Sequence, residues 1–410
     1  MTDGAADLDR AVRDAGGRIL AALVARFRDL DLAEEAFAFA CAAAAEAWRR
    51  DGPPRDPAAW LYAAGRRRGL DLIRRAKVRG AYRPDDPEPV PTPEEAAMAR
   101  LEPIPDERLR LIFACCHPAL APEARIALTL RVICGLSVER LARAFLVGET
   151  AMIQRLTRAK QKIRAANIPF EVPGPEAWGE RLEAVLAALE IAYAQAYEDA
   201  AGAGEGAEFA EETLRLSGVL VDLLPAEPEV LGLAALIRLA EARRGARLGA
   251  EGEMVPLTEQ DPALWDAGML GEAASLLGSA AALRRTGPYQ ILAAIHAAHA
   301  SRRETGETPW ADIVVLYDAL VMMRPSAVVE VNRAVALEHV AGPDVALEAL
   351  VAANAEGRLD DHAPYHAALG RVCAEAGRRD EARAALQRAL DLVRTPAERR
   401  FLERRLAELG

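Results

Sequence analysis

Apolar residues recur at every third or fourth position along most of this chain, which is the spacing of amphipathic helices and not of strands. The pattern is clearest in residues 136–164. Ser137 is a natural N-cap for a short helix that runs through Ala144. Gly148 follows as a residue that tolerates a tight turn, and a longer helix begins after it.

The longer helix divides into an apolar face and a basic face. Its predicted inward residues are Ile153, Leu156, Ala159 and Ile163. Its predicted outward residues are Arg155, Arg158, Lys160, Lys162 and Arg164. A short helix, a turn and a second helix with a basic face are the layout of a helix-turn-helix, whose second helix fits the major groove of DNA. The alternative is a solvated basic helix inside an ordinary helical bundle.

The N-terminal part of the chain predicts three further helices. Residues 8–30 form the first. Asp31 is expected to cap the second, with Glu34 completing a capping box, and this helix runs to Trp48. A loop rich in Pro, Gly and charged residues follows, and Asp56 is the expected N-cap of the third helix.

The third helix begins the densest basic run in the sequence. Between Trp60 and Arg83 a single acid, Asp71, stands among eight basic residues: Arg66, Arg67, Arg68, Arg74, Arg75, Lys77, Arg79 and Arg83. A basic helix beside an aromatic ring can bind melted DNA, because aromatic rings stack on bases and cations follow phosphates. The alternative places Trp60 in the core and the cations in solvent, and a lone tryptophan is more often a core residue.

Proline-rich segments divide the chain. Residues 84–105, rich in Pro, Asp and Glu, and residues 169–176 predict linkers. From residue 177 the pattern is helical to the end, and near the end it repeats. Five positions recur at an offset of 36 residues, Ala334, Leu337, Ala346, Leu350 and Ala353 matching Gly370, Cys373, Ala382, Leu386 and Ala389. This offset is close to the period of about 34 residues of tetratricopeptide repeats.

Composition and charge favour an all-α protein with two different halves. The chain is rich in Ala, Leu and Arg, and aromatic residues make up 5% of it. The net charge of −11 combines +5 over residues 1–170 with −16 over the remainder. Such asymmetry indicates a front half that faces nucleic acid and an acidic rear half.

Candidate chemistry is sparse. Cys115, Cys116 and His117 are adjacent and, with Cys134, lack the spacing of a zinc site, so buried packing is the favoured interpretation. His296 and His299 lie one helical turn apart without a third ligand. No hydrolase, P-loop or metalloprotease motif is present, so the sequence predicts no enzyme, no metal and no cofactor. Unpaired cysteines and the lack of a secretory signal or an apolar span predict a cytoplasmic protein without membrane contact.

Two basic helical modules joined by an acidic Pro-rich linker resemble the extracytoplasmic-function (ECF) sigma factors of bacterial RNA polymerase. Residues 31–48 look like the polymerase-binding helix of region 2, and residues 57–75 look like the helix that melts and reads the −10 element. Residues 154–160 look like the −35 recognition helix of region 4. Residues 113–118 and the helical tail are similar to the subgroup with a C-terminal tetratricopeptide-like domain.

The resemblance implies a domain order: region 2 at 8–83, a linker at 84–105, region 4 at 106–168, a linker at 169–176 and a tetratricopeptide-like domain at 177–410. It implies that core RNA polymerase contacts Asp31, Glu34 and Glu35. It implies that the melted −10 element contacts Trp60, Arg66, Arg67, Arg74 and Arg75. It implies that the −35 element contacts Thr150, Gln154, Arg155, Arg158 and Lys160. The expected function is promoter-specific initiation, with the C-terminal domain regulating it in cis or binding a protein partner.

Two other functions fit parts of the pattern. A one-component transcriptional regulator would combine a helix-turn-helix with a helical ligand-binding domain and would bind duplex DNA alone, usually as a dimer. A tetratricopeptide scaffold would carry the basic front half without sequence-specific DNA binding. The second basic run, at residues 57–83, argues against the regulator, which has no use for a helix that reads melted DNA.

Overall fold

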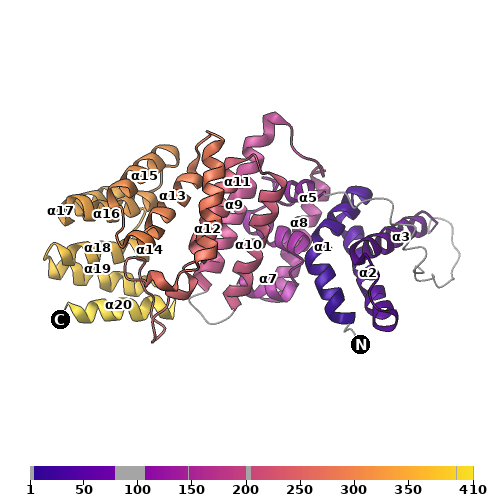
Figure 1. Ribbon diagram of the computed structural model, residues 1–410, viewed down its shortest axis with the longest axis horizontal. Coiled ribbons are helices and arrows are strands. Elements are labelled where there is room, and N and C mark those ends of the chain that lie inside the picture. Colours follow the sequence, from indigo (N-terminus) through magenta and orange to yellow (C-terminus); the bar gives the residue numbers. More distant parts are fainter. Residues whose placement is uncertain (1–3, 79–106, 146, 200–204, 394, 410) are drawn as a thin grey trace. The chain divides into compact units, whose positions relative to one another are not determined.

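The computed structural model describes residues 4–78, 107–145, 147–199, 205–393 and 395–409 (Figure 1). Every regular element within these ranges is a helix, accompanied by one isolated β-bridge between Leu248 and Met254. The all-α prediction is therefore confirmed. The chain divides into two compact units, Met1–Ala192 and Tyr193–Gly410. The predicted linker at 84–105 lies outside the described residues, as does the end of the basic run at 79–83.

Three helices form the first module of the N-terminal unit: α1 (Gly4–Phe27), α2 (Leu30–Asp51) and α3 (Pro57–Val78). They pack on one another through small residues on α2, because Ala33, Ala36, Ala40 and Ala44 are fully buried. Asp56 caps α3 as predicted, its Oδ1 accepting the amide of Ala59 at 2.9 Å.

The predicted cap of α2 was wrong by about half a turn. The N-cap is Asp29, which has extended backbone angles and accepts the amide of Leu32 at 3.1 Å. Asp31 instead lies inside the first turn of the helix. Because its carboxylate is not used to cap the helix, it can take a partner from elsewhere in the chain.

Five helical segments form the second module: α5 (Arg108–Cys115), α6 (Pro122–Thr129), the π-helix η2 (Leu130–Cys134), α7 (Val138–Ala144) and α8 (Glu149–Ala165). Gly135 ends η2 in the left-handed conformation, with φ 76°. Ser137 caps α7 as predicted, its Oγ accepting the amide of Arg140 at 3.2 Å. The helix-turn-helix layout of α7 and α8 is thus present.

One prediction about α8 was wrong. The buried residues are Met152, Leu156, Ala159 and Ile163, so Met152 replaces Ile153, which is 51% exposed. The two residues are neighbours on the helix, and packing against α6 and α7 selects between them. Gly148 is the N-cap of α8 with φ −69°, a conformation that any residue adopts, so the turn does not depend on glycine there.

The rest of the chain is a series of packed helices. Helix α9 (Pro175–Asp199) crosses the boundary between the units. The others are α10 (Glu205–Leu223), α11 (Pro228–Glu241), η3 (Arg244–Ala246), η4 (Pro262–Leu264), α12 (Ala267–Ala282), α13 (Pro288–Ala300), α14 (Arg302–Thr305), α15 (Trp310–Met323), α16 (Ala327–Ala341), α17 (Pro343–Ala353), α18 (Ala363–Glu375), α19 (Arg379–Leu392) and α20 (Pro396–Glu408).

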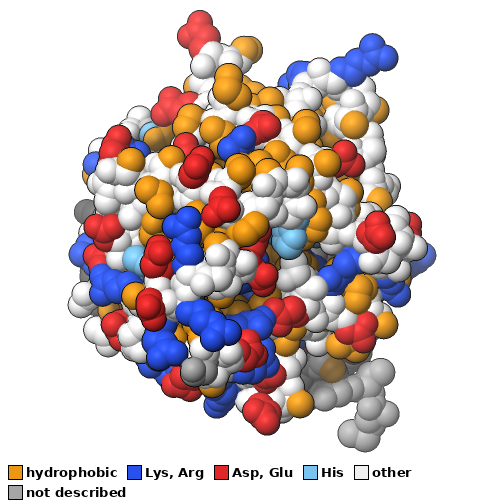
Figure 2. Space-filling view, turned by 90° about the vertical axis from the view of Figure 1, so that its left-hand side faces the viewer, with side chains coloured by type: hydrophobic (Ala, Val, Ile, Leu, Met, Phe, Trp, Pro, Cys, Tyr) orange, Lys and Arg blue, Asp and Glu red, His pale blue; other side chains and the backbone are white. Residues whose placement is uncertain are grey.

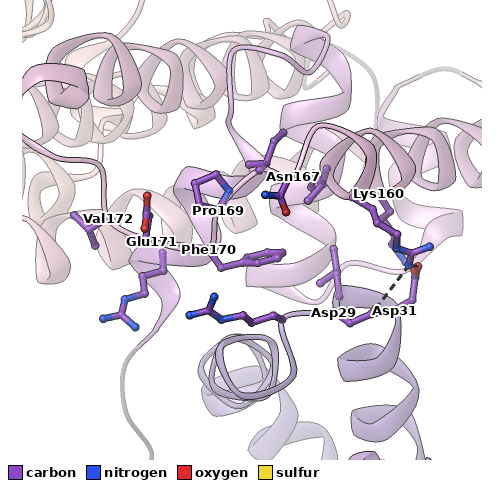
Figure 3. A pocket seen from close by; sticks show the side chains of 14 residues that line it. Asp29, Asp31, Lys160, Asn167, Pro169, Phe170, Glu171 and Val172 are labelled. Atoms are coloured by element: carbon purple, nitrogen blue, oxygen red, sulfur yellow. Dashed lines mark hydrogen bonds and ion pairs between the residues drawn. The ribbon is translucent and has the colours of Figure 1, made fainter. Parts of the chain in front are cut away.

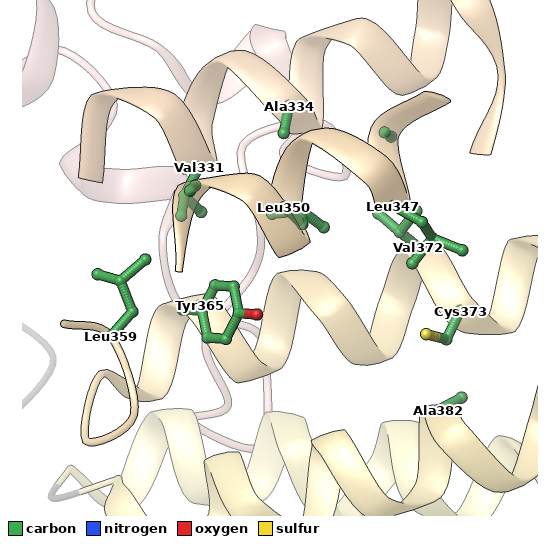
Figure 4. Packing of buried hydrophobic residues seen from close by; sticks show 11 residues of the cluster. Val331, Ala334, Leu347, Leu350, Leu359, Tyr365, Val372, Cys373 and Ala382 are labelled. Carbon is green, nitrogen blue, oxygen red and sulfur yellow. The ribbon is translucent and has the colours of Figure 1, made fainter. Parts of the chain in front are cut away.

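The two sequence repeats coincide with two pairs of consecutive helices, α16 with α17 and α18 with α19, whose members pack on each other. Their equivalent positions are buried except Leu337, which is half-buried, and Figure 4 shows part of the shared cluster, from Val331 and Ala334 to Cys373 and Ala382. A Cβ at Gly370 would lie 2.6 Å from Leu386 Cγ, so only glycine permits this helix crossing. Small residues at the repeat positions therefore set how closely the paired helices approach.

The surface of the C-terminal unit mixes charges of both signs. The face in Figure 2 shows acidic and basic side chains beside one another, with apolar side chains between them. Helices α15 and α17 contribute exposed apolar residues, of which Met322, Val315 and Val351 are 84%, 65% and 62% exposed. The face in Figure 2 carries no broad basic surface of the kind that binds phosphates.

We predict opposite effects from the same substitution at two helical glycines of this unit. A Cβ at Gly232 on α11 would lie 2.7 Å from the backbone nitrogen of Gln290 on α13, so Gly232→Ala should destabilise the protein by about 1–3 kcal/mol. A Cβ at Gly271 on α12 meets nothing within 4 Å, so Gly271→Ala should stabilise the protein by about 0.5–1 kcal/mol. Urea unfolding followed by circular dichroism measures both, and equal shifts would contradict this packing.

Candidate nucleic-acid interface

One stripe of α8 points into solvent. Thr150, Gln154 and Arg158 lie four residues apart along the helix, and all three are exposed. The Arg158 guanidinium stays close to its own helix, where its Nε donates to the Gln154 carbonyl at 3.3 Å. Ile153 lies on the same stripe with half of its surface exposed. A helix with one exposed stripe of mixed hydrogen-bonding and apolar groups has the form that reads base edges in a major groove.

Arg155 borders this stripe and is half-buried. Its guanidinium carbon lies 5.4 Å from the ring centroid of Phe145, a cation–π contact. The contact joins α8 to Phe145, which directly follows α7, and holds the side chain at the rim of the exposed stripe. Four of the five predicted −35 residues are therefore in or beside one solvent-facing surface.

Lys160 is the fifth, and it faces a different way. Its side chain is 19% exposed, and its ammonium group forms ion pairs with Glu34 and, at 3.2 Å, with Asp31. Burial lowers the pKa of Lys160, but the hydrogen bonds and charges of the two carboxylates outweigh it and raise the pKa above its ordinary value. In this conformation Lys160 binds α2 and does not face solvent.

Arg164 extends the same contact by one helical turn. Its Nη2 lies 2.6 Å from Asp31 Oδ2 and 3.7 Å from Asp29 Oδ1. The predicted polymerase-binding residues Asp31 and Glu34 thus pair with the helix predicted to read DNA. Periodicity alone did not predict this contact, because it joins residues more than 120 positions apart.

Glu35 lies beside this cluster but turns towards α3. Its Oε1 is 3.8 Å from the guanidinium of Arg68, and its side chain is 60% exposed. It is the most exposed of the three predicted polymerase-binding carboxylates.

The basic helix α3 keeps its arginines at the surface but not its tryptophan. Arg66, Arg74 and Arg75 are exposed, and Arg67 is half-buried. Trp60 is 5% exposed, and its ring meets that of Trp48 edge to face at 5.7 Å. A ring enclosed in this way cannot stack on a base, so the structure corrects the DNA-binding assignment of Trp60, which is a core residue.

A cavity of about 550 Å³ lies next to the ion pairs (Figure 3). Its walls come from the start of α2, the end of α8 and the segment 169–172 that follows α8. Cations and carboxylates line it together, including Arg28, Arg110 and Glu171. The mixture gives the cavity no strong preference for an anion or a cation.

The cysteine cluster is a packing feature, as predicted. Cys115 and Cys116 are buried, and Cys116 Sγ lies 3.3 Å from Thr129 Oγ1. Burial raises the pKa of Cys116 to about 11, so the thiol stays protonated at neutral pH. Among the residues that the structure describes, no three His, Cys, Asp or Glu side chains are placed to hold a metal ion.

The two predicted histidines contact rings and a cation. His296 Nδ1 lies 2.8 Å from a guanidinium nitrogen of Arg243, and His299 meets Trp310 edge to face at 5.2 Å. Burial and the nearby Arg243 lower the pKa of both, that of His299 to about 4. Both rings are therefore neutral at pH 7. His339 stacks on the other side of the cluster, its ring 3.8 Å from Trp310.

Comparison with known families adds a function to the second module. Residues 110–163 match the family model "Sigma-70, region 4", which gives α5–α8 a DNA-binding role in transcription. Residues 181–281 match a "Family of unknown function (DUF6596)". The chain is 43% identical over 407 residues to "Uncharacterized protein R00370" of Rhizobium meliloti (strain 1021), covering 98% of this chain and 96% of that protein. No solved structure matches.

A membrane span is also absent from the described helices, since none of them combines the necessary length and hydropathy.

We predict that Trp60 acts through stability. Trp60→Ala should destabilise the protein by about 3–5 kcal/mol, because it removes a large buried ring and leaves a cavity beside Trp48. Trp60→Phe should cost much less, and Arg74→Ala, at an exposed position of the same helix, should change stability by no more than about 0.5 kcal/mol. Thermal unfolding followed by circular dichroism measures all three. Unchanged stability in Trp60→Ala would contradict the core assignment and support the original prediction that Trp60 contacts DNA.

We predict that the histidine pair makes the C-terminal unit sensitive to acid. Both pKa values lie below the unfolded value of about 6.5, so the unfolded chain binds protons first as the pH falls. The stabilisation is complete above that pH and is lost towards pH 4, with a slope of up to about 1.4 kcal/mol per pH unit for each histidine. In urea unfolding at pH 7 and pH 5, His299→Gln should lose less stability on acidification than the unchanged protein. An equal loss would place the acid sensitivity elsewhere.

Proposed function

We propose that this chain, which belongs to one family with its Rhizobium meliloti relative and carries a sigma-70 region 4, is an ECF-type sigma factor of RNA polymerase. Its partners would be core polymerase and promoter DNA, and it would carry out no chemical step itself. The observation that carries the proposal is the region 4 module with an exposed stripe on its second helix, preceded in the chain by a second helix rich in exposed arginines.

In this proposal the exposed stripe of α8 reads the −35 element. Arginine pairs with guanine and glutamine with adenine through two hydrogen bonds each, which suits Arg158 and Gln154. Thr150 and Ile153 carry methyl groups that can contact the methyl group of thymine. Arg155, at the rim of the stripe, is placed to contact phosphate and fix the register of the helix.

The −10 element is assigned to α3. Arg66, Arg67, Arg74 and Arg75 supply cations for the backbone of a melted strand. The loop before α3 would hold the unstacked base, and the energy released on base capture and phosphate contact would support strand opening. Trp60 holds α3 against α2 and supports this surface from the inside.

The acidic side chains near the start of α2 are assigned to polymerase. Asp31, Glu34 and Glu35 lie within the first turns of the helix, where carboxylates can meet a basic surface of the polymerase. Glu35 is the most exposed of them.

The C-terminal unit is proposed to be a tetratricopeptide-like domain that regulates initiation or contacts polymerase. Paired helices with a 36-residue offset and small residues at the crossing support this assignment. Its acidic balance argues against a DNA-binding role for the unit itself. The unit includes part of the segment that matches the family of unknown function.

The second candidate is a one-component regulator, since the chain joins a helix-turn-helix to a separate helical unit. Transcription in vitro with purified core polymerase separates the two functions. A sigma factor gives transcripts from specific promoters that depend on its addition. A regulator binds duplex DNA tightly without core polymerase, and a scaffold does neither.

We predict that Arg155→Glu with Arg158→Glu abolishes initiation that depends on a −35 element and leaves core binding unchanged. Each phosphate interaction that the variant removes should lower the salt dependence of promoter binding by about one unit in the log–log slope. Arg383→Glu, an exposed charge reversal on α19, is the matched control and should change neither property. The assignment of α8 would be refuted by a failure to bind core polymerase or by an unchanged salt slope.

A further inference from the structure

We propose that this structure shows a closed arrangement of the N-terminal unit. In it, the end of α8 in the second module covers the acidic start of α2 in the first module (Asp29, Asp31 and Glu34). On the proposed function, on which this inference rests, part of that surface is the polymerase-binding site. The closed arrangement then excludes polymerase until α8 moves away, so the chain carries its own inhibitor of core binding.

The first support is the geometry of the ion pairs. Lys160 binds Glu34 and Asp31, and Arg164 binds Asp31 and Asp29, so two cations are set against three carboxylates. Figure 3 shows Lys160 near Asp31. The Lys160 and Glu34 side chains are only 19% and 22% exposed. A polymerase surface that needs the Glu34 carboxylate cannot reach it while Lys160 covers it.

The second support is a close backbone contact between the same two modules. A Cβ added to Gly17 on α1 would overlap the carbonyl oxygen of Ile133 in η2. Gly17 is thus the residue that lets the first module approach the second this closely. Its neighbour Gly16 makes no such contact, because a Cβ there meets Phe37 of the first module at 3.5 Å, an ordinary distance.

The third support is the distance between the two promoter elements. As their names state, the −35 and −10 elements lie about 25 base pairs apart, which at 3.4 Å each is about 85 Å of duplex. In the closed arrangement α8 touches α2, so the two modules cannot bind both elements at once. The 28 residues at 79–106 could span about 95 Å when fully extended, so the length of the chain permits the separation.

The closed arrangement lowers the apparent affinity for polymerase without changing the binding surface. When only a fraction of the molecules is open, the apparent dissociation constant equals the intrinsic constant divided by that fraction. A variant that removes the closing contacts should therefore bind core polymerase more tightly. This gain in affinity appears only if the substitution leaves unchanged the residues of this chain that contact polymerase.

The experiment uses Arg164→Ala, because Arg164 belongs to neither the proposed −35 set nor the proposed polymerase set. Removing its two ion pairs should strengthen binding of the full chain to purified core polymerase by about 1.5- to 5-fold. Lys162→Ala, at an exposed position of the same helix, is the matched control and should leave the affinity unchanged.

A second pair of variants tests the same closure without altering any charge. Gly17→Ala should separate the modules and give a similar gain in affinity, although alanine favours the helix itself. Gly16→Ala adds the same methyl group one residue earlier and should give no gain. Fluorescence anisotropy with labelled protein measures all four affinities.

Amide hydrogen exchange gives a readout that does not depend on polymerase. Peptides that cover residues 28–36 and 130–136 should exchange faster in Arg164→Ala and Gly17→Ala than in the two controls. Unchanged exchange together with unchanged or weaker polymerase binding would overturn the closed state. Faster exchange with no binding of any version to core polymerase would overturn the proposed function and with it the inhibition, while the closed arrangement of the two modules would stand.

Discussion

The ion pairs between α8 and the start of α2 join the two modules of the N-terminal unit by charge, beside the packing of α1 against η2 and α5. A helix that binds DNA must present cations, and a surface that binds a basic patch of polymerase must present carboxylates. Both proposed surfaces belong to one chain, so each is a ready partner for the other. The pairing of Lys160 with Glu34 follows from this complementarity, although 126 residues separate them in sequence. Closure is thus a consequence of placing two opposite binding surfaces on one chain.

Local rules were enough to predict most of the helices. Ser137, Asp56 and Gly135 each end or begin a helix through a hydrogen bond or a backbone angle that involves only nearby residues. The rules failed where two neighbouring residues satisfy them equally well. Asp29 and Asp31 are both good caps, and Met152 and Ile153 are both good core residues. Packing against other helices decides between such neighbours, and a periodic pattern does not contain that information.

The predictions of site residues also succeeded where local pattern decides and failed where contacts between helices decide. The resemblance assigned Thr150 and Gln154 to DNA, and periodicity placed Arg158 on the outer face of α8; all three are exposed there. Periodicity also placed Lys160 outside, but a side chain that points away from its own module can still face another one. The prediction that Trp60 contacts DNA was wrong for the opposite reason: the ring is enclosed by Trp48, which lies on a different helix. Sequence analysis therefore identifies which residues carry charge or aromatic surface, and contacts between elements determine which of them are accessible.

The chemistry of the closing contact suits a reversible switch. An exposed ion pair contributes about 0.2–1 kcal/mol, and the Arg164 pair, with both side chains at least half exposed, belongs to this class. The Lys160 pair is more enclosed, so breaking it leaves carboxylates that need another cation. In the proposed switch a basic surface on polymerase supplies that cation, and the exchange replaces one set of ion pairs with another. Opening would also have to separate α1 from η2 and α5, which pack on each other beside these charges, so an exchange of ion pairs lowers the cost of opening and does not set it alone.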